Sequence, residues 1–216
     1  MEKGEKIVYF VRHGESVANV SKVFQPPTSP LNEKGKEQAA RIAERAKNID
    51  FETLIASPWA RAAETAQVIA QATGKEPEFS ELFVERVKPS SINGKSYEDE
   101  QANATWREWE ESLYTSGARV EDGEGFDDLV ARADKALDFL LARKEETMLV
   151  VTHGFFFRVM VAHILAGERL TGELHRSFQY AMAMKNTGLS VLRYHGGFEE
   201  PPRWRLWIYN DHAHLG

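Results

Sequence analysis

The chain has no cysteine among its 216 residues. This absence excludes a disulfide framework, a metal site built from thiolates and a thiol nucleophile. Any chemistry must therefore come from other side chains. Because nothing in the chain requires an oxidising compartment, we expect a cytoplasmic location.

Long hydrophobic runs are also missing. The first apolar run covers only residues 7–11, which is too short for the core of a signal peptide. The most apolar stretch, residues 148–166, is interrupted by His153, Arg158 and His163. We therefore expect neither a secretory signal nor a membrane-spanning helix.

Positive charge is in deficit, since 27 Lys and Arg stand against 33 Asp and Glu, for a formal net charge of −6 at pH 7. This balance disfavours a nucleic-acid partner but permits a local cationic pocket. Hydrophobic residues make up 42% of the chain and charged residues 28%, as in ordinary globular proteins. We expect one soluble domain, residues 1–216, that binds a small molecule. The sequence carries no signal for an oligomeric state.

Two apolar runs lead into the same His-Gly dipeptide. They are residues 7–11, followed by Arg12-His13-Gly14, and residues 148–151, followed by Thr152-His153-Gly154. Each run is typical of a buried strand. Ligands of an open parallel sheet bind outside the carboxyl ends of its strands, so we expect His13 and His153 to face one pocket.

Strand and helix patterns alternate along the chain, which predicts an α/β fold with a mainly parallel sheet covered on both faces. The expected strands are 6–11, 53–56, 147–152, 186–194 and 203–209, and the expected helices are 33–47, 58–72, 126–142 and 155–165. Asn32 is predicted to cap the first helix. Ser57 is predicted to cap the second, with Pro58 at its first position and Arg61 in its first turn.

The pattern changes between Arg86 and Gly125. Proline, glycine and serine bracket a stretch that holds Trp106, Trp109 and clustered acids. We expect residues 86–125, approximately, to form a small, partly helical cap insertion over the sheet edge. Such insertions commonly carry specificity, because the scaffold fixes the chemistry and loops select the substrate.

These residue types suit phosphoryl transfer to a histidine. A neutral imidazole can attack phosphorus and later surrender the phosphoryl group to water, and we assign His13 to this role. Arg12 and Arg61 offer paired donors for the phosphoryl oxygens. His153, protonated or donating one N–H, would hold a third oxygen, and the amide of Gly154 would add a donor. This charge balance calls for no metal and no other cofactor.

Several segments resemble the histidine phosphatase superfamily, also called the phosphoglycerate mutase-like family. In the family's order they are 11–19 (Val-Arg-His-Gly-Glu-Ser-Val-Ala-Asn), 31–35 with 38–39, 57–66 (Ser-Pro-Trp-Ala-Arg-Ala-Ala-Glu-Thr-Ala) and 152–154. Together they cover most of the chain outside the cap. The resemblance implies a Rossmann-like, three-layer α/β/α domain with a phosphate pocket at the strand ends.

The resemblance also implies a general acid and substrate contacts. Glu85 stands in a segment similar to the family's acid-bearing segment, and strand-like apolar residues before it would carry it to the pocket; Glu15 is the alternative acid. Asn19 either caps a turn or donates to substrate. Gln25 is a substrate contact by resemblance.

Phosphatases and mutases of this family share the phosphohistidine step and differ in the acceptor, which is water or a second hydroxyl group. Ala18 stands where the mutases usually have tryptophan, and the insertion after Phe24 is short. We therefore favour a metal-independent phosphomonoesterase acting on a small phosphorylated metabolite. A phosphoglycerate mutase and a non-catalytic module that binds phosphorylated ligands are the alternatives.

The substrate alcohol is left open by the sequence. Arg86 and Lys88 favour a second anionic group, whereas Trp106 and Trp109 favour an aromatic or apolar alcohol. The Phe155-Phe156-Phe157 run is expected to be core, with one ring available to line the pocket. The tail, residues 211–214, is expected to be a solvated terminus and not a metal site.

Overall fold

A computed structural model of the chain describes residues 5–197 and 200–216 and has a six-stranded sheet at its centre, in the order β3-β2-β4-β1-β5-β6. The strands are β1 (Lys6–Arg12), β2 (Thr53–Ala56), β3 (Pro77–Phe79), β4 (Thr147–Thr152), β5 (Leu189–Gly197) and β6 (Glu200–Asp211). The first four run parallel, and β5 and β6 pair antiparallel at one edge. The mainly parallel sheet is confirmed. Residues 1–4, where no secretory signal is expected, lie outside the described residues.

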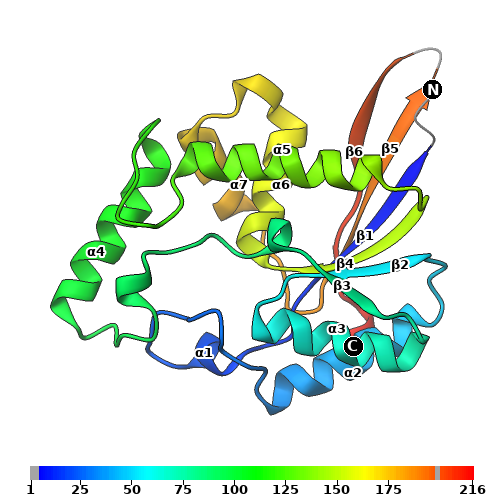
Figure 1. Ribbon diagram of the computed structural model, residues 1–216, viewed down its shortest axis with the longest axis horizontal. Coiled ribbons are helices and arrows are strands. Elements are labelled where there is room, and N and C mark those ends of the chain that lie inside the picture. Colours follow the sequence, from blue (N-terminus) through cyan, green and yellow to red (C-terminus); the bar gives the residue numbers. More distant parts are fainter. Residues whose placement is uncertain (1–4, 198–199) are drawn as a thin grey trace.

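Helices cover both faces of this sheet (Figure 1). They are α1 (Val17–Val20), α2 (Glu33–Ala46), α3 (Ala60–Thr73), α4 (Glu100–Glu111), α5 (Phe126–Ala142), α6 (Gly154–Ala166) and α7 (Gly172–Ala181). One face packs on α5 and α6, and the other packs on α2 and α3. The three-layer α/β/α expectation is therefore confirmed. None of the helices within the described residues has the length and apolar content needed to cross a membrane.

Alternation along β1 explains why its central residues, 7–11, are a continuous apolar run. Val8 and Phe10 belong to the core that includes α5 and α6, whereas Val11 belongs to the core that includes α2 and α3. All three side chains are fully buried. Successive strand residues point to opposite faces, and both faces are covered, so a continuous apolar run is required.

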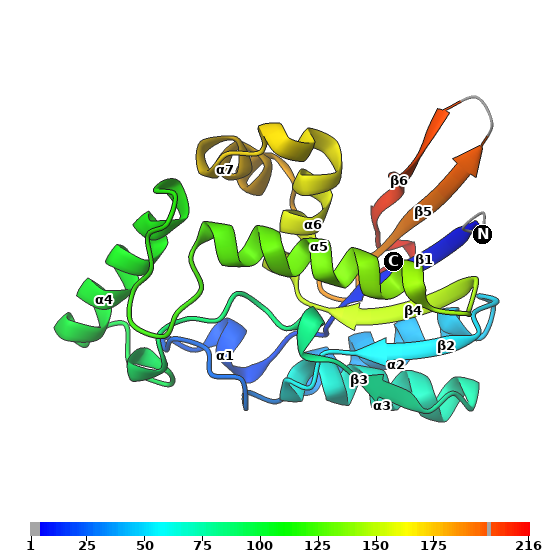
Figure 2. The same ribbon diagram turned by 45° about the horizontal axis from the view of Figure 1, so that its top comes forward.

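The carboxyl ends of the parallel strands point toward the side of the molecule where α1 and α4 lie (Figure 2). On that side β1 pairs with β4 in a register that sets Arg12 beside Thr152. The residues that follow, His13 and His153, therefore leave the sheet side by side. Residues 86–125, which include α4, occupy the space beyond these strand ends; their assignment as a cap insertion stays a prediction.

Several expected boundaries are wrong. The helix expected to begin at Ser57 and Pro58 begins at Ala60, because the Ser57 hydroxyl hydrogen-bonds His153 Nε2 and caps no helix. The strand expected from residue 186 begins at Leu189, after a turn in which Thr187 has a φ of 57°. Instead of extending a helix or a strand, both segments contact residues at the strand ends: Ser57 bonds His153, and the Thr187 amide donates to the carbonyl group of Arg12.

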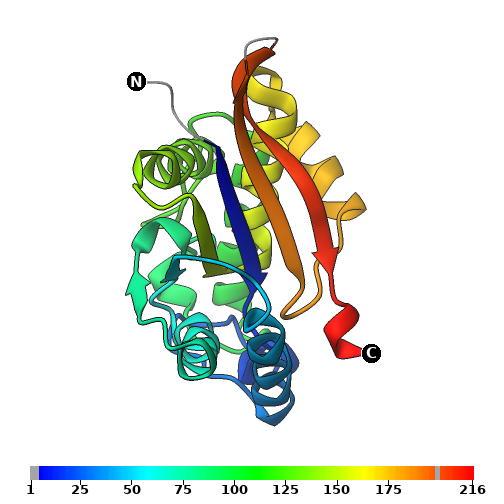
Figure 3. The same cartoon turned by 90° about the vertical axis from the view of Figure 1, so that its right-hand side faces the viewer.

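The segment before Glu85 is also not strand-like. Residues 81–83 form a short 3-10 helix, and an extended stretch follows it. The C-terminal tail differs from expectation too, because it docks on α2 (Figure 3). Asp211 forms an ion pair with Arg45, and His214 hydrogen-bonds Thr187. Only part of the tail is therefore solvated.

Two glycines let the loop after β1 pack directly on α2. A Cβ on Gly35 would lie 1.9 Å from the carbonyl oxygen of Glu15, and one on Gly14 would lie 2.5 Å from the carbonyl oxygen of Gly35. Real side chains essentially never reach such distances to backbone, so the contact requires glycine on both sides. It fixes the loop that starts with His13 against the first turn of α2.

We predict that Gly35→Ala destabilises the protein, because its Cβ would push the backbone of the His13 loop away from α2. The expected loss is about 1–3 kcal/mol in the free energy of unfolding, as for overpacking of a tight core. Urea unfolding followed by circular dichroism measures it. Glu37→Ala, at an exposed position of the same helix, is the control and should change stability by less than about 0.5 kcal/mol. Equal stabilities of the two variants would contradict the argument.

Candidate active site

The two histidines at the strand ends face each other. Their ring centroids are 5.0 Å apart, and both residues are almost completely buried. Arg61 reaches them from the first turn of α3, which begins just after the carboxyl end of β2. The expectation that distant segments bring His13, His153 and Arg61 to one place is met by this geometry.

The hydrogen bonds of His13 determine its tautomer. Nδ1 lies 2.6 Å from the carbonyl oxygen of Gly14, which can only accept. Nε2 lies 3.1 Å from Arg61 Nε, which can only donate. The proton is therefore on Nδ1, and Nε2 carries a lone pair. This is the form that a nucleophilic imidazole requires.

The surroundings also keep both rings neutral. Burial, followed by the positive charges of Arg61 and Arg12, lowers the pKa of His13 well below its ordinary value. Burial and the same arginines lower the pKa of His153 in the same direction. Of the two alternatives for His153, the free protein therefore favours the neutral ring that donates one N–H over the protonated one.

Arg12 is held at the site with one donor unused. One terminal N–H donates to the carbonyl oxygen of Met184, while the buried Nε has no partner. Gly154 makes room for this side chain, because a Cβ there would lie 3.1 Å from Arg12 Nε. The glycine was expected to expose its amide to the ligand, and the observed close approach is instead to a guanidinium. An unsatisfied buried donor costs about 1–3 kcal/mol, a cost that a bound oxyanion removes.

His153 is fixed from outside by two residues of the β2–α3 loop. Its Nε2 lies 2.8 Å from the Ser57 hydroxyl, and its ring makes an edge contact with Trp59, with centroids 5.3 Å apart. The buried Nδ1 of His153 has no partner. This loop therefore orients the second histidine and the Arg61 side chain together.

Glu85 lies at the amino terminus of α6. Its carboxylate accepts hydrogen bonds from the amides of Phe155 and Phe156, at 3.1 and 2.8 Å. Helix amino termini attract negative charge, so this placement holds the side chain in one orientation. Although the preceding residues are not a strand, the structure does bring Glu85 to the same pocket as Arg61.

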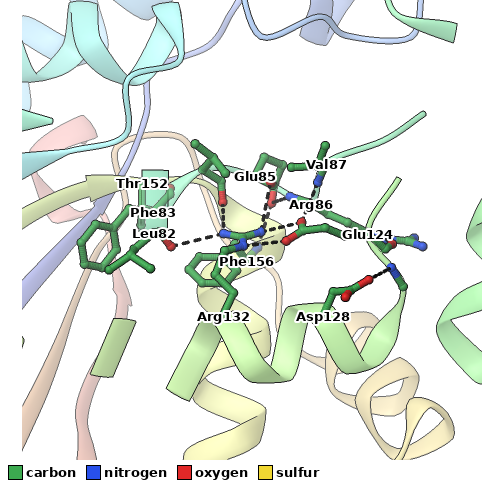
Figure 4. Close-up of polar contacts among 12 residues, drawn as sticks. Leu82, Phe83, Glu85, Arg86, Val87, Glu124, Asp128, Arg132, Thr152 and Phe156 are labelled. Atoms are coloured by element: carbon green, nitrogen blue, oxygen red, sulfur yellow. Dashed lines mark hydrogen bonds and ion pairs between the residues drawn. The ribbon is translucent and has the colours of Figure 1, made fainter. Parts of the chain in front are cut away.

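Arg132 of α5 fixes the segment that carries Glu85 (Figure 4). Its guanidinium donates to three carbonyl groups of that segment, those of Leu82, Val84 and Glu85. It also forms a two-pronged ion pair with Glu124, with both N···O distances at 2.7 Å. Bidentate pairs of this kind restrict geometry strongly.

Glu15, the alternative acid, is engaged elsewhere. Its carboxylate accepts from Asn32 and Lys34, both at 2.9 Å. The hydrogen bond from Asn32, and then that from Lys34, lower the pKa of Glu15 below its ordinary value. Glu15 also does not line the pocket that Arg61 and Glu85 share, so its position does not suit proton transfer there.

A cavity of about 270 Å³ is lined by Arg61, which hydrogen-bonds His13, and by Glu85. Its lining comprises Ala18, Asn19, Phe24, Gln25, Arg61, Glu85, Arg86, Lys88, Tyr97, Trp106, Trp109, Glu110 and Phe155. Phe156 and Phe157 are fully buried, so the phenylalanine run is core with one ring in the pocket. Asn19 lines this cavity and also caps α1 by exchanging hydrogen bonds with Ser16. Gln25 donates to the Ser16 hydroxyl.

Arg86 does not serve as a free anion site. Every nitrogen of its guanidinium donates, and the acceptors are the carbonyl groups of Trp109 and Glu124, the Ser112 hydroxyl and the Glu110 carboxylate. Its plane also lies 3.5 Å from the Trp109 ring centroid. Arg86 therefore anchors residues 109–124 to the segment that carries Glu85.

The turn at residues 186–187 holds the backbone of Arg12 and His13, and no sequence pattern predicted it. Asn186 donates to the carbonyl oxygen of His13 at 2.9 Å, and the Thr187 amide donates to that of Arg12 at 2.9 Å. Thr187 adopts left-handed backbone, which is unfavourable for a β-branched residue. Strain of this kind clusters at functional sites, but no sequence pattern announces it.

Within residues 5–197 and 200–216, no group of three or more metal-binding side chains is found. The polar atoms that lack partners at the centre of the site are Arg12 Nε and His153 Nδ1. Guanidinium donors and a neutral imidazole suit a tetrahedral oxyanion.

We predict that Arg61→Met raises the pKa of His13, because the variant removes a positive charge that disfavours the imidazolium ion. Burial is the larger cause, so the pKa should remain below its ordinary value near 6.5. NMR titration of ¹³C-labelled histidine rings measures the change. Arg41→Met, at an exposed position of α2, is the matched control and should leave His13 unaffected. An unchanged His13 pKa in Arg61→Met would refute the electrostatic argument.

Comparison with known proteins places these features in context. The family description of the histidine phosphatase superfamily (branch 1) matches residues 8–206. A relative from Erwinia tasmaniensis, named probable phosphoglycerate mutase GpmB, is 32% identical over 166 residues, 73% of this chain and 74% of that protein.

Two solved structures share the fold. Bacillus stearothermophilus YhfR aligns with a TM-score of 0.80 at 23% identity and covers 98% of this chain and 100% of its own. The mycobacterial glucosyl-3-phosphoglycerate phosphatase aligns with a TM-score of 0.76 at 22% identity and covers 97% and 100%. At these identities the likeness establishes the architecture alone.

Proposed function

Because the chain belongs to the histidine phosphatase superfamily, branch 1, we propose that it hydrolyses a small phosphomonoester through a phosphohistidine formed on His13. The observation that carries this proposal is the state of the His13 ring. Its Nε2 lone pair is held by a donor from Arg61, and its Nδ1 proton is held by the Gly14 carbonyl group. The nucleophile is thus neutral and oriented before substrate arrives.

In the first step His13 Nε2 attacks phosphorus, and the bond between phosphorus and the alcohol oxygen breaks. Arg61 Nε transfers its hydrogen bond from the ring to a phosphoryl oxygen, and the unused Nε of Arg12 binds another. His153 contacts a third oxygen through one ring N–H. Positioning and charge stabilisation supply most of the rate, as in other phosphoryl transfers.

Glu85 protonates the departing alkoxide in this scheme. It then accepts a proton from the water molecule that attacks phosphohistidine, so one carboxyl group serves both half-reactions. The position of Glu85 supports this role. Glu85 lines the same cavity as Arg61, and the Arg132 guanidinium holds the Glu85 backbone by a hydrogen bond to its carbonyl group. The reaction returns His13 to its neutral form and releases inorganic phosphate. No step requires a metal ion.

Water is the proposed acceptor, which makes the protein a phosphatase. Ala18 lines the cavity at the position where the mutase branch usually carries tryptophan. The mycobacterial structural neighbour is named a phosphatase. A phosphoglycerate mutase is the second candidate, favoured by the name of the Erwinia relative.

We predict that His13→Asn lowers phosphate release from p-nitrophenyl phosphate by about 10³-fold or more, because the variant has no nucleophile. Wild-type protein mixed with ³²P-labelled substrate and quenched in alkali should carry label, and His13→Asn should carry none. His212→Asn, at an exposed histidine, is the control. Turnover or labelling that survives in His13→Asn would rule out the proposed intermediate.

The same preparation separates hydrolysis from mutase activity. With 3-phosphoglycerate and 2,3-bisphosphoglycerate present, a phosphatase should release phosphate faster than it forms 2-phosphoglycerate. The reverse order would establish the mutase. Binding of phosphate esters without either reaction would establish a recognition module.

We predict that Glu85→Gln affects substrates according to their leaving groups. Glycerol phosphate has a basic alkoxide leaving group and should lose about 10²-fold or more in kcat/KM, because that oxygen needs a proton and kcat/KM reports only the steps up to loss of the alcohol. p-Nitrophenyl phosphate has a stable leaving group and should lose far less. Glu81→Gln, at a neighbouring exposed position, should behave as wild type. Equal losses for both substrates would show that Glu85 does not act as the acid.

A further inference from the structure

The cavity beside the reaction centre contains a lysine that the proposed mechanism does not use. Lys88 shares this cavity with Arg61 and Glu85, whereas Arg12, His13 and His153 are not part of its lining. Since the phosphoryl group must lie against those three residues, Lys88 faces the part of the pocket left for the alcohol. The position of Lys88 is therefore that of a specificity residue.

Lys88 is largely removed from water and has only one hydrogen-bond partner, the carbonyl oxygen of Gln25. Its ammonium group has three donors. Among the described residues, no ion pair includes it. Burial, and then the nearby charge of Arg61, lower the pKa of Lys88 to about 8. Lys88 is thus a half-buried cation that has one hydrogen bond and no ion pair, and its remaining donors are available to an anionic ligand.

The charges around Glu85 show what kind of ligand is missing. Apart from Arg86, four cations have this carboxylate as a negative neighbour, namely Arg12, Arg61, Lys88 and Arg158. A bound phosphate ester adds two negative charges, which leaves this group with an excess of one positive charge. Arg86 does not contribute to the excess, because Glu110 and Glu124 are its nearest opposite charges.

Of the four cations near Glu85, Lys88 is the one that can bind a negative charge on the alcohol part of the substrate. Arg12 and Arg158 do not line the cavity, and Arg158 donates to the carbonyl groups of Gly154, Gln179 and Met182. Arg61 is committed to His13 and the phosphoryl group. Aromatic rings form half of the remaining lining and suit the carbon skeleton of a small molecule, while the one other carboxylate of the lining, that of Glu110, is paired with Arg86.

We infer that Lys88 binds an anionic group on the alcohol part of the substrate, so that the preferred substrate is a phosphomonoester carrying a carboxylate or a second phosphate. This inference rests on the proposed function for the orientation of the substrate. The sequence leaves open whether the alcohol carries a second anionic group or is aromatic or apolar, and the inference favours the second anionic group.

The test compares esters that differ only in the second charge. 3-Phosphoglycerate and glycerol 1-phosphate differ by a carboxylate in place of a hydroxymethyl group. The bisphosphate and monophosphate of 1,3-propanediol differ by a second phosphate. For each pair, kcat/KM for phosphate release is measured in the wild type, Lys88→Met and Lys88→Arg. Lys95→Met, exposed and outside this cavity, is the control for the change in net charge.

The wild type should prefer the charged member of at least one pair by tenfold or more, and that pair identifies the anion. Lys88→Met should abolish most of this preference and alter the uncharged member by less than threefold. Lys88→Arg should retain it. Equal losses of kcat/KM for both members of a pair in Lys88→Met would mean that Lys88 contacts the phosphoryl group. Equal kcat/KM values for both members in the wild type would mean that the protein does not recognise a second anion. Either result overturns the inference.

Calorimetric titration of His13→Ala with the same esters keeps this result separate from the proposed function. Absence of turnover in the wild type would defeat the phosphatase proposal. The affinity ratio within each pair, and its loss in the His13→Ala, Lys88→Met double variant, would still decide the role of Lys88.

Discussion

The parallel pairing of β1 with β4 is the constraint on which the site depends. Its register sets Arg12 beside Thr152, so the next residues, His13 and His153, leave the sheet together. The apolar alternation that buries both strands fixes this register, because a shift by one residue would exchange the two covered faces. A change deep in the sheet would therefore move the two imidazoles relative to each other.

Around this pair the protein concentrates groups that are unfavourable without a ligand. Arg61 is a buried cation, and Arg12 Nε and His153 Nδ1 are buried polar atoms without partners. Each feature costs stability in the empty protein, and each is relieved by an oxyanion. The tight glycine contact between the His13 loop and α2 contributes to holding this arrangement while the site is empty.

Residues whose roles follow from strand ends were predictable, and those whose roles follow from irregular backbone were not. His13 and His153 come directly after the carboxyl ends of strands, and Arg61 lies in the first turn of the helix that follows β2, where a parallel sheet exposes its crevice. Ser57 carried a valid capping signal, but its hydroxyl bonds His153 instead, because tertiary contact outweighed local preference. Asn186 and Thr187 gave no signal at all, since a left-handed threonine is the opposite of what turn propensities favour.

The prediction of Glu85 was correct about its place in the pocket but wrong about the backbone that carries it. A strand was expected to carry it, yet the preceding residues form a short 3-10 helix and then an extended stretch, whose carbonyl groups are held by Arg132. Arg132 is paired with Glu124, near the end of the expected cap (Figure 4). Arg86, the residue after Glu85, donates to the carbonyl group of Trp109. The acid and the walls of the alcohol pocket are thus held by one network of charged contacts. We expect substitutions that reshape the pocket through residues 109–124 to move the Glu85 segment as well, so the proposed substrate selection and the proposed proton transfer depend on the same contacts.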